Sequence, residues 1–290
     1  MTAFVALCLL SRLAYALNDV LVGRLARQHS DVEVAALRGL SLGLTMAPLL
    51  FWVPAAAWGQ LAHEWPSYLL LIVVTAIANV LQNRAARFLP FGLRAAILLS
   101  AVSVASIALG AVFFAERLSL PHLALCVVLV GAALVAALGA HATHEIQPDV
   151  PKGSALALAS GVGLAVAGLL TKRLATETHP LLTAWAWEFG AGACLALPML
   201  WQWRRGAPPD VVRRFLQTAK ASAPTIIGSA ASLVALGIGA LGLWGALAGT
   251  QVLFTAALGV LWHREAMGLR RWLCFAAAAG ALSGLALLAP

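Results

Sequence analysis

The sequence predicts an all-α integral membrane protein with ten transmembrane helices, arranged as two inverted-topology repeats of five helices. Three observations support this prediction: the composition, the number of long apolar runs, and the similarity of the two halves of the chain. Of 290 residues, 62% are hydrophobic and only 10% are charged, and the mean hydropathy is +0.91. A water-soluble protein of this size would have too few polar residues to cover its surface.

Long apolar runs indicate spanning helices, because about 20 residues that each rise about 1.5 Å cross a hydrocarbon core about 30 Å thick. Ten runs of sufficient length follow one another along the chain. They predict helices at residues 4–23, 34–57, 67–86, 93–115, 121–140, 153–172, 181–201, 223–241, 243–262 and 271–289.

The two halves of the chain align at a nearly constant offset. Ser11 aligns with Ser160, and Arg24 aligns with Arg173, both at an offset of 149. A constant offset of about half the length, held by polar and apolar landmarks alike, indicates an internal duplication.

Each half also closes on the same pattern. A long uncharged apolar run leads into a glutamate, Glu116 in the first half and Glu265 in the second, and a short polar step and one more apolar run follow. Five helices per half is an odd number, so the second half would cross the membrane in the opposite sense to the first. We therefore expect two domains, residues 1–145 and 150–290, with the substrate site near the membrane midplane where they meet.

These features resemble the EamA-type branch of the drug/metabolite transporter superfamily over the whole chain. The residues that carry the resemblance are Asn18-Asp19 and Arg24 in the first helix, Arg38 in the second, and the two glutamate turns. The resemblance implies a transporter with a small solute and the lipid bilayer as its partners, and we expect it in the inner membrane of a bacterium. The Asn-Asp and Arg placement is similar to members that carry S-adenosylmethionine or riboflavin, whereas better-known members export amino acids. Gly249-Thr250-Gln251 departs from the adenosylmethionine-type pattern.

Polar side chains inside the predicted helices are the candidate site. An ionised side chain at membrane depth costs about 2.5–3.5 kcal/mol, so it must face protein or water rather than lipid. We expect the substrate-binding site to be built from Arg12, Tyr15, Asp19, Arg38, Asn79, Gln82, Trp185, Glu188 and Gln251.

The charges in this set suggest how a solute would bind. Glu188 aligns with Arg38 at an offset of 150, so the two either face each other across a central cavity or form a buried ion pair that holds the halves together. A cationic group of the solute would bind beside Trp185 and Glu188. A carboxylate would bind Arg12 or Arg38, and a zwitterion would use both kinds of contact.

The basic residues predict the orientation in the membrane. Loops after the odd-numbered predicted helices carry fourteen Lys and Arg residues, and loops after the even-numbered ones carry three. The positive-inside rule then places both termini outside, whereas the family resemblance suggests termini inside. Arg84, Arg87 and Arg94, which surround the turn at Pro90, are expected to anchor lipid headgroups. Because the basic residues flank the membrane, the net charge of +8 does not indicate a nucleic acid as partner.

The sequence therefore predicts a secondary active transporter that exports an amino acid or a similar solute by alternating access, with protons as a coupling ion. The alternatives are uptake of a cofactor-like solute of the S-adenosylmethionine or riboflavin type, and a non-transporting scaffold or lipid-handling subunit. The chain lacks the motifs His-Glu-x-x-His, Gly-x-Ser-x-Gly and a Gly-rich phosphate loop, which argues against an enzyme and against direct ATP drive. Four scattered cysteines offer neither a disulfide framework nor a metal spacing. No cofactor is expected, and a monomer is compatible with the sequence.

Overall fold

The computed structural model describes residues 2–89, 91–137, 149–206, 210–263 and 269–287, and its regular structure is helical throughout these ranges. The first half contains α1 (Thr2–Gln28), α2 (Asp31–Met46), the 3-10 helix η1 (Ala47–Trp52), α3 (Ala55–His63), α4 (Trp65–Ala85), α5 (Phe91–Phe114) and α6 (Leu120–Ala137). The second half contains α7 (Val150–Glu177), α8 (Pro180–Arg204), α9 (Val211–Ile238), α10 (Leu241–Ala248), α11 (Thr250–His263) and α12 (Leu269–Leu287).

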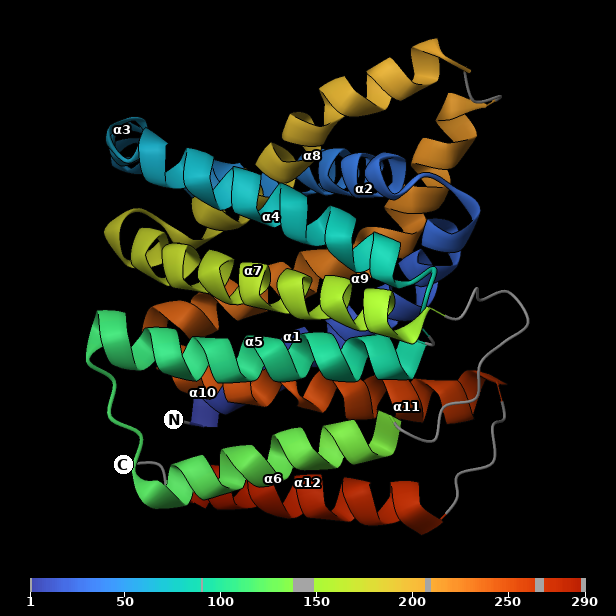
Figure 1. The fold of residues 1–290 in the computed structure, drawn as a ribbon. Helices are drawn as coiled ribbons and strands as arrows, with labels where there is room; N and C mark the ends of the chain where they lie inside the picture. Colours follow the sequence, from blue (N-terminus) through green and yellow to red (C-terminus); the bar gives the residue numbers. More distant parts are fainter. Residues whose placement is uncertain (1, 90, 138–148, 207–209, 264–268, 288–290) are drawn as a thin grey trace.

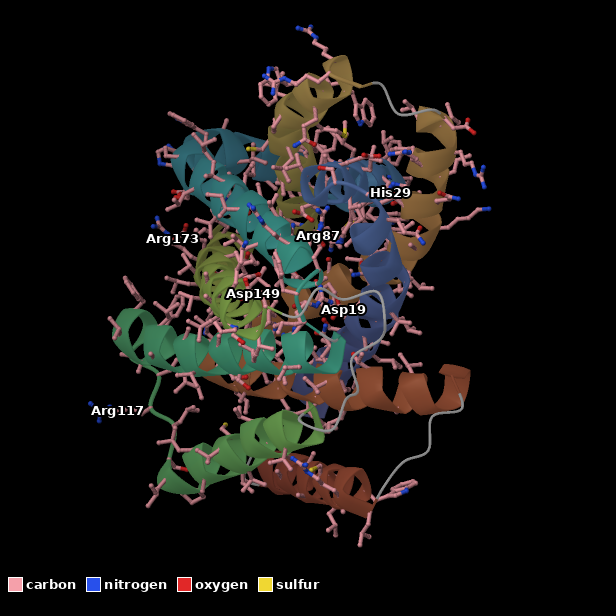
Figure 2. All side chains as sticks on the ribbon, turned by 45° about the vertical axis from the view of Figure 1, so that its right-hand side comes forward. Asp19, His29, Arg87, Arg117, Asp149 and Arg173 are labelled. Atoms are coloured by element: carbon pink, nitrogen blue, oxygen red, sulfur yellow. The ribbon has the colours of Figure 1, made fainter. Side chains whose placement is uncertain are left out.

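Most helices run along one common direction (Figure 1). The start of α1, the end of α12 and the α5–α6 connection lie at one end of the bundle, and the end of α4, the start of α5 and the α1–α2 turn lie at the other. Figure 2 accordingly shows Arg117, after α5, far from His29, after α1. Within the described residues, six helical segments are long and apolar enough to cross a membrane, namely those in α1, α2 with η1, α4, α5, α7 and α9.

The helices differ from the predicted spans in three places. The second span ends as an α-helix at Met46, because Pro48 lies at the start of η1 and lacks the N–H that would continue the α-helical ladder. The ninth span is divided at Gly249 into α10 and α11. The polar stretch before the eighth span, predicted to be a loop, is helical from Val211 onward as part of α9.

Helices that align between the halves also pack on each other. In this way α2 contacts α8, α5 contacts α10, and α6 contacts α12. The α1–α9 contact corresponds to the α7–α4 contact, because α1 aligns with α7 and α4 aligns with α9. The α2–α8 approach is close, because a Cβ on Gly39 would lie 2.6 Å from the Gly192 Cα and from the Glu188 backbone oxygen. Glycine at both positions lets the two backbones touch, as small residues do in membrane helix pairs.

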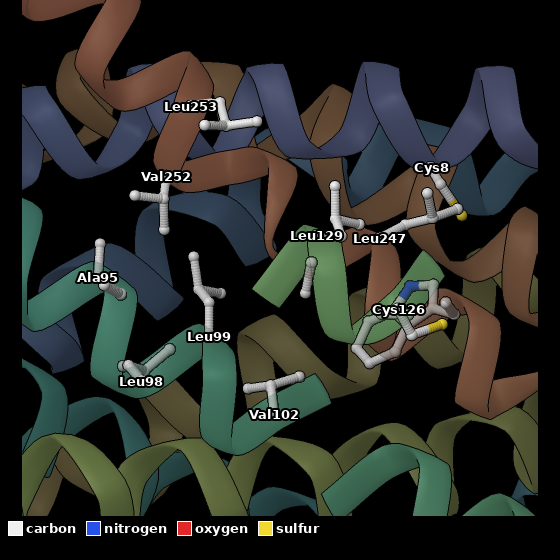
Figure 3. Close-up of a cluster of buried hydrophobic side chains, with 14 of the residues drawn as sticks. Cys8, Ala95, Leu98, Leu99, Val102, Cys126, Leu129, Leu247, Val252 and Leu253 are labelled. Carbon is white, nitrogen blue, oxygen red and sulfur yellow. The ribbon is translucent and has the colours of Figure 1, made fainter. Parts of the chain in front are cut away.

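A large buried apolar cluster lies between α5, α6, α10 and α11 (Figure 3). Leu99 and Val102 of α5 are almost fully buried in it, together with Leu129 of α6, Leu247 of α10 and Val252 of α11. Leu99 and Val102 also border the central cavity described below, so this cluster supports one wall of the candidate site.

Candidate substrate cavity

A cavity of about 100 Å³ lies between the two halves of the chain, with walls from α1, α2, α4 and α5 on one side and from α7, α8, α10 and α11 on the other. This volume is large enough for several waters or for a small solute. Its polar lining consists of Arg12, Tyr15, Asn18, Asp19, Arg38, Asn79, Gln82, Asn83, Arg94, Glu188 and Gln251. Its apolar lining includes Val22, Leu98, Leu99, Val102, Leu164, Trp187 and Trp244.

Eight of the nine residues predicted for the site line this cavity. They are Arg12, Tyr15, Asp19, Arg38, Asn79, Gln82, Glu188 and Gln251, and their contact with a substrate stays a prediction.

The ninth predicted residue, Trp185, is not part of the lining. Its ring N–H donates a hydrogen bond of 3.1 Å to the Gly43 backbone oxygen. The ring stacks on Phe189 at 5.0 Å between centroids and meets Trp58 edge-on. Trp185 therefore packs in the α2–α8 contact beside Phe189, whose side chain occupies the space that a Cβ on Gly43 would need.

The first polar group in the cavity is centred on Glu188. The Arg38 guanidinium lies 3.2 Å from Glu188 Oε2 and also donates to Oε1 at 3.3 Å. The Ser229 hydroxyl donates to the same Oε1 at 2.7 Å, and the Tyr15 hydroxyl shares a hydrogen bond of 3.0 Å with Ser229. Of the two arrangements that the sequence left open, the structure contains the buried ion pair, and the network joins α1, α2, α8 and α9.

The second polar group is centred on Asp19, which lies inside the bundle near the α4–α5 turn (Figure 2). Gln251 donates to Asp19 Oδ2 at 2.7 Å, and Gln82 donates to Oδ1 at 3.4 Å. The Arg94 guanidinium lies 3.9 Å from Asp19 Oδ1 and also donates to the Gln82 backbone oxygen. With only 3% of Arg94 exposed, its predicted role as a headgroup anchor is wrong. Arg94 lies in the first turn of α5, from which its side chain reaches inward to Asp19 instead of outward to the membrane surface.

The third charged group is Arg12, which is 4% exposed and lies between two aromatic rings. Its guanidinium carbon is 4.5 Å from the centroid of the Trp244 ring and 5.9 Å from that of Tyr15. Its Nε and Nη2 atoms are buried without a hydrogen-bond partner in the described part of the chain. No carboxylate of those residues lies within ion-pair distance of Arg12. The aromatic faces offset part of the cost of burying this cation.

Sequence reasoning left several lining residues out of the predicted site, among them Asn18, Asn83, Trp187 and Trp244. Asn18 and Asn83 are the direct chain neighbours of predicted site residues. Trp244 follows a different signal, because it lies seven residues before Gln251 and therefore near the same helical face.

Charged side chains also close both ends of the bundle. At the end opposite the termini, Arg87 pairs with Asp31 at 2.8 Å, and Arg214 pairs with Glu33 at 2.7 Å. Burial, followed by the positive charge of Arg214, lowers the pKa of His29 in the α1–α2 turn below its usual value. These contacts tie the α1–α2 turn to α9 and to the segment after α4.

At the other end, Glu116 binds the N-terminus of α10. Its carboxylate accepts hydrogen bonds from the backbone N–H groups of Leu241 at 2.7 Å and Gly242 at 2.9 Å, and it pairs with Lys172 Nζ at 2.5 Å. A carboxylate at a helix N-terminus is stabilised by the unpaired N–H groups and by the helix dipole. Glu116 thus joins the α5–α6 connection to the second half. Its aligned counterpart, Glu265, lies outside the described residues.

Comparison with known proteins agrees with this architecture. The model of the EamA-like transporter family matches residues 2–138. A solved crystal structure shares the fold with a TM-score of 0.75 at 16% sequence identity, over 98% of this chain and 97% of that chain. No curated protein matches the chain. The match over residues 2–138 confirms the resemblance to EamA-type transporters predicted from the sequence, and together with the six apolar helical segments it indicates a multi-pass membrane protein.

Proposed function

We propose that the protein is a secondary active transporter that exports an amino acid or an amino-acid-like solute by alternating access. The observation that carries this proposal is the convergence of charged side chains from both halves on one cavity between them. Charges at membrane depth are expensive, and they typically mark a substrate or ion pathway. The charged residues of the cavity are Arg12, Asp19, Arg38, Arg94 and Glu188.

The size and the mixed charge of the cavity favour a small zwitterion. Both carboxylates and guanidiniums line it, and the uncharged amides of Asn79 and Gln82 lie among them. A cavity of about 100 Å³ suits a small solute such as a common amino acid better than a larger one. Riboflavin and S-adenosylmethionine are several times larger, so this conformation supports the amino-acid class over the cofactor class.

The packing of the helices supports the transport mechanism. Contacts between aligned helices, α2 with α8 and α5 with α10, are those expected if residues 1–145 and 150–290 are inverted five-helix repeats about an axis in the membrane plane. In transporters built this way, one repeat rocks against the other around a fixed site at their interface. The cavity lies at that interface.

Proton coupling is proposed to act through Glu188. This carboxylate is buried and pairs with Arg38, so the ammonium group of a solute and a proton would compete for the same negative charge. Export with one proton entering per solute would follow from such competition.

The test is exchange in reconstituted vesicles. Purified protein in liposomes loaded with an unlabelled amino acid should accumulate the same labelled amino acid from outside, and a panel of amino acids, polyamines, nucleosides, riboflavin and S-adenosylmethionine defines the class. Arg117→Gln is the matched control, because Arg117 is exposed outside the cavity, and it should exchange at the parent rate. Exchange of flavin or nucleoside only would replace the amino-acid assignment. Failure of every solute to exchange, with the protein folded, would refute transport and favour a scaffold.

A further inference from the structure

We infer that Arg12 is the binding site for a carboxylate group of the transported solute. This inference rests on the proposed transport function and deepens it, because it defines the chemical group that a solute must carry. The sequence left Arg12 and Arg38 as equivalent candidates for this role, and the structure separates them.

Arg38 and Arg94 already have acidic partners in the cavity. Arg38 contacts both oxygens of Glu188, and Arg94 pairs with Asp19. A solute carboxylate at either position would compete with a carboxylate of the protein. Arg12 has no such competitor within ion-pair distance in the described chain, so the cavity carries one guanidinium in excess over its carboxylates.

The geometry of Arg12 selects a planar anion. Its two donors without partners, Nε and Nη2, belong to one edge of the guanidinium plane. Two parallel N–H groups on one edge match the two oxygens of a carboxylate in a bidentate contact. The guanidinium carbon lies 4.5 Å from the centroid of the Trp244 ring, and the two donors of this edge are buried without a hydrogen-bond partner in the described part of the chain.

A structural role alone leaves the two unpaired donors of Arg12 unexplained. An arginine that only supported neighbouring helices would donate to backbone carbonyls, because buried donors without partners cost stability. Arg12 is one of the most buried charged residues of the chain at 4% exposure, and it lines the cavity. A bound carboxylate would satisfy both donors and balance the charge.

The test uses four small probes that differ only in their charged groups: acetate, acetamide, glycine and glycinamide. Acetate and glycine carry a carboxylate, whereas acetamide and glycinamide replace it with a neutral amide of similar shape. All four have at most five non-hydrogen atoms, so cavity size does not discriminate among them. The thermal unfolding midpoint of the purified protein is measured with each probe at rising concentration. A probe at about ten times its Kd should raise the midpoint by about 3 °C.

Acetate and glycine should stabilise the parent protein, and acetamide should not. In Arg12→Gln the stabilisation by acetate should vanish, and Arg12→Lys should retain part of it because the charge remains. Arg117→Gln, exposed outside the cavity, controls for general salt effects and should respond like the parent. If Arg12→Gln does not fold, two comparisons still test the role of Arg12. One compares the stabilisation by acetate in Arg12→Lys and in the parent, and the other compares the stabilisation of the parent by acetate and by acetamide.

Two results would overturn the inference. One is equal stabilisation by acetate in the parent and in Arg12→Gln, and the other is no greater effect of acetate than of acetamide on the parent. A different result would refute the proposed function alone. If acetate stabilises the parent protein but not Arg12→Gln, and neither glycine nor any larger amino acid binds or exchanges, the carboxylate site is supported and the amino-acid assignment is refuted. Conversely, if glycinamide stabilises as well as glycine, and Arg12→Gln changes neither effect, the protein recognises amines and the Arg12 inference falls while transport stands.

Discussion

Replacing Glu188 by Gln removes one charge from the ion pair between the two halves. The amide keeps an oxygen that can accept the Ser229 hydrogen bond of 2.7 Å, so the change is confined to the charge. Arg38 then keeps its positive charge at 13% side-chain exposure, opposite a neutral group. The variant therefore separates a proton-coupling carboxylate from a fixed structural pair.

The structure sets the size of the effect. At the observed 3.2 Å and an effective dielectric constant of about 20, the Coulomb attraction is about 5 kcal/mol. Removing one partner of a buried pair typically costs about 3–5 kcal/mol, because the other charge is left uncompensated. We therefore expect Glu188→Gln to lose about 3–5 kcal/mol of unfolding free energy, and Arg38→Gln with Glu188→Gln to recover a large part of that loss.

Two assays on the same preparations decide the role of the carboxylate. Unfolding by a denaturing detergent measures stability, and vesicles measure solute exchange and flux driven by a proton gradient. We expect Glu188→Gln to keep exchange under conditions in which it is folded, and to lose the dependence of flux on the proton gradient. Glu177→Gln is the control, since that carboxylate is 43% exposed in a surface pair and should change neither property. Unchanged rate and unchanged pH dependence in Glu188→Gln would show that coupling lies elsewhere.

Three further predictions follow from the contacts. Gly39→Ala should destabilise the protein by at least about 1–3 kcal/mol, because its Cβ would lie 2.6 Å from backbone atoms of α8. In the same unfolding assay, Gly131→Ala in α6 should be neutral or stabilising by up to about 1 kcal/mol, because no atom lies within 4 Å of the new Cβ. Equal effects of the two substitutions would contradict the close α2–α8 contact. Glu116→Gln should cost about 1–2 kcal/mol through the loss of charge at the α10 N-terminus and beside Lys172, and an unchanged unfolding midpoint would refute the capping role. A C-terminal alkaline phosphatase fusion should be active and a C-terminal fluorescent-protein fusion should not fluoresce, because the positive-inside rule places the termini outside. The reverse pattern would show that the C-terminus lies inside and would contradict the predicted orientation.

Most helices could be predicted because lipid requires every backbone polar group to be paired within its own segment, so long apolar runs have few alternatives to a helix. Hydropathy detects only the part of a helix that lies in lipid, and this explains the error at the start of α9. Residues 211–222 carry the basic side chains of Arg213, Arg214 and Lys220, which argued for a loop. The helix continues through them, and Arg214 binds Glu33 of α2.

The site could be predicted as far as depth and residue type allow, because polar residues inside apolar runs are few. The direction of a long side chain near a helix end is a different matter. Arg94 could extend to the headgroups or fold back into the protein, and only the position of Asp19 on another helix decides it. The placement of Trp185 depends in the same way on a partner distant in sequence, the Gly43 backbone oxygen.

The contact of Arg38 with Glu188 also determines which halves can pair. The two positions correspond in the alignment of the halves, and the two side chains are in contact in the structure. In a symmetric dimer of two first halves, two arginines would therefore face each other at this position. In a dimer of two second halves, two glutamates would face each other. Like charges at such a distance repel by several kcal/mol. Only the mixed pair is attractive at this point. A chain whose two halves carry opposite charges at this point can therefore specify its own assembly, and we expect either half expressed alone to associate with the other half in preference to another copy of itself.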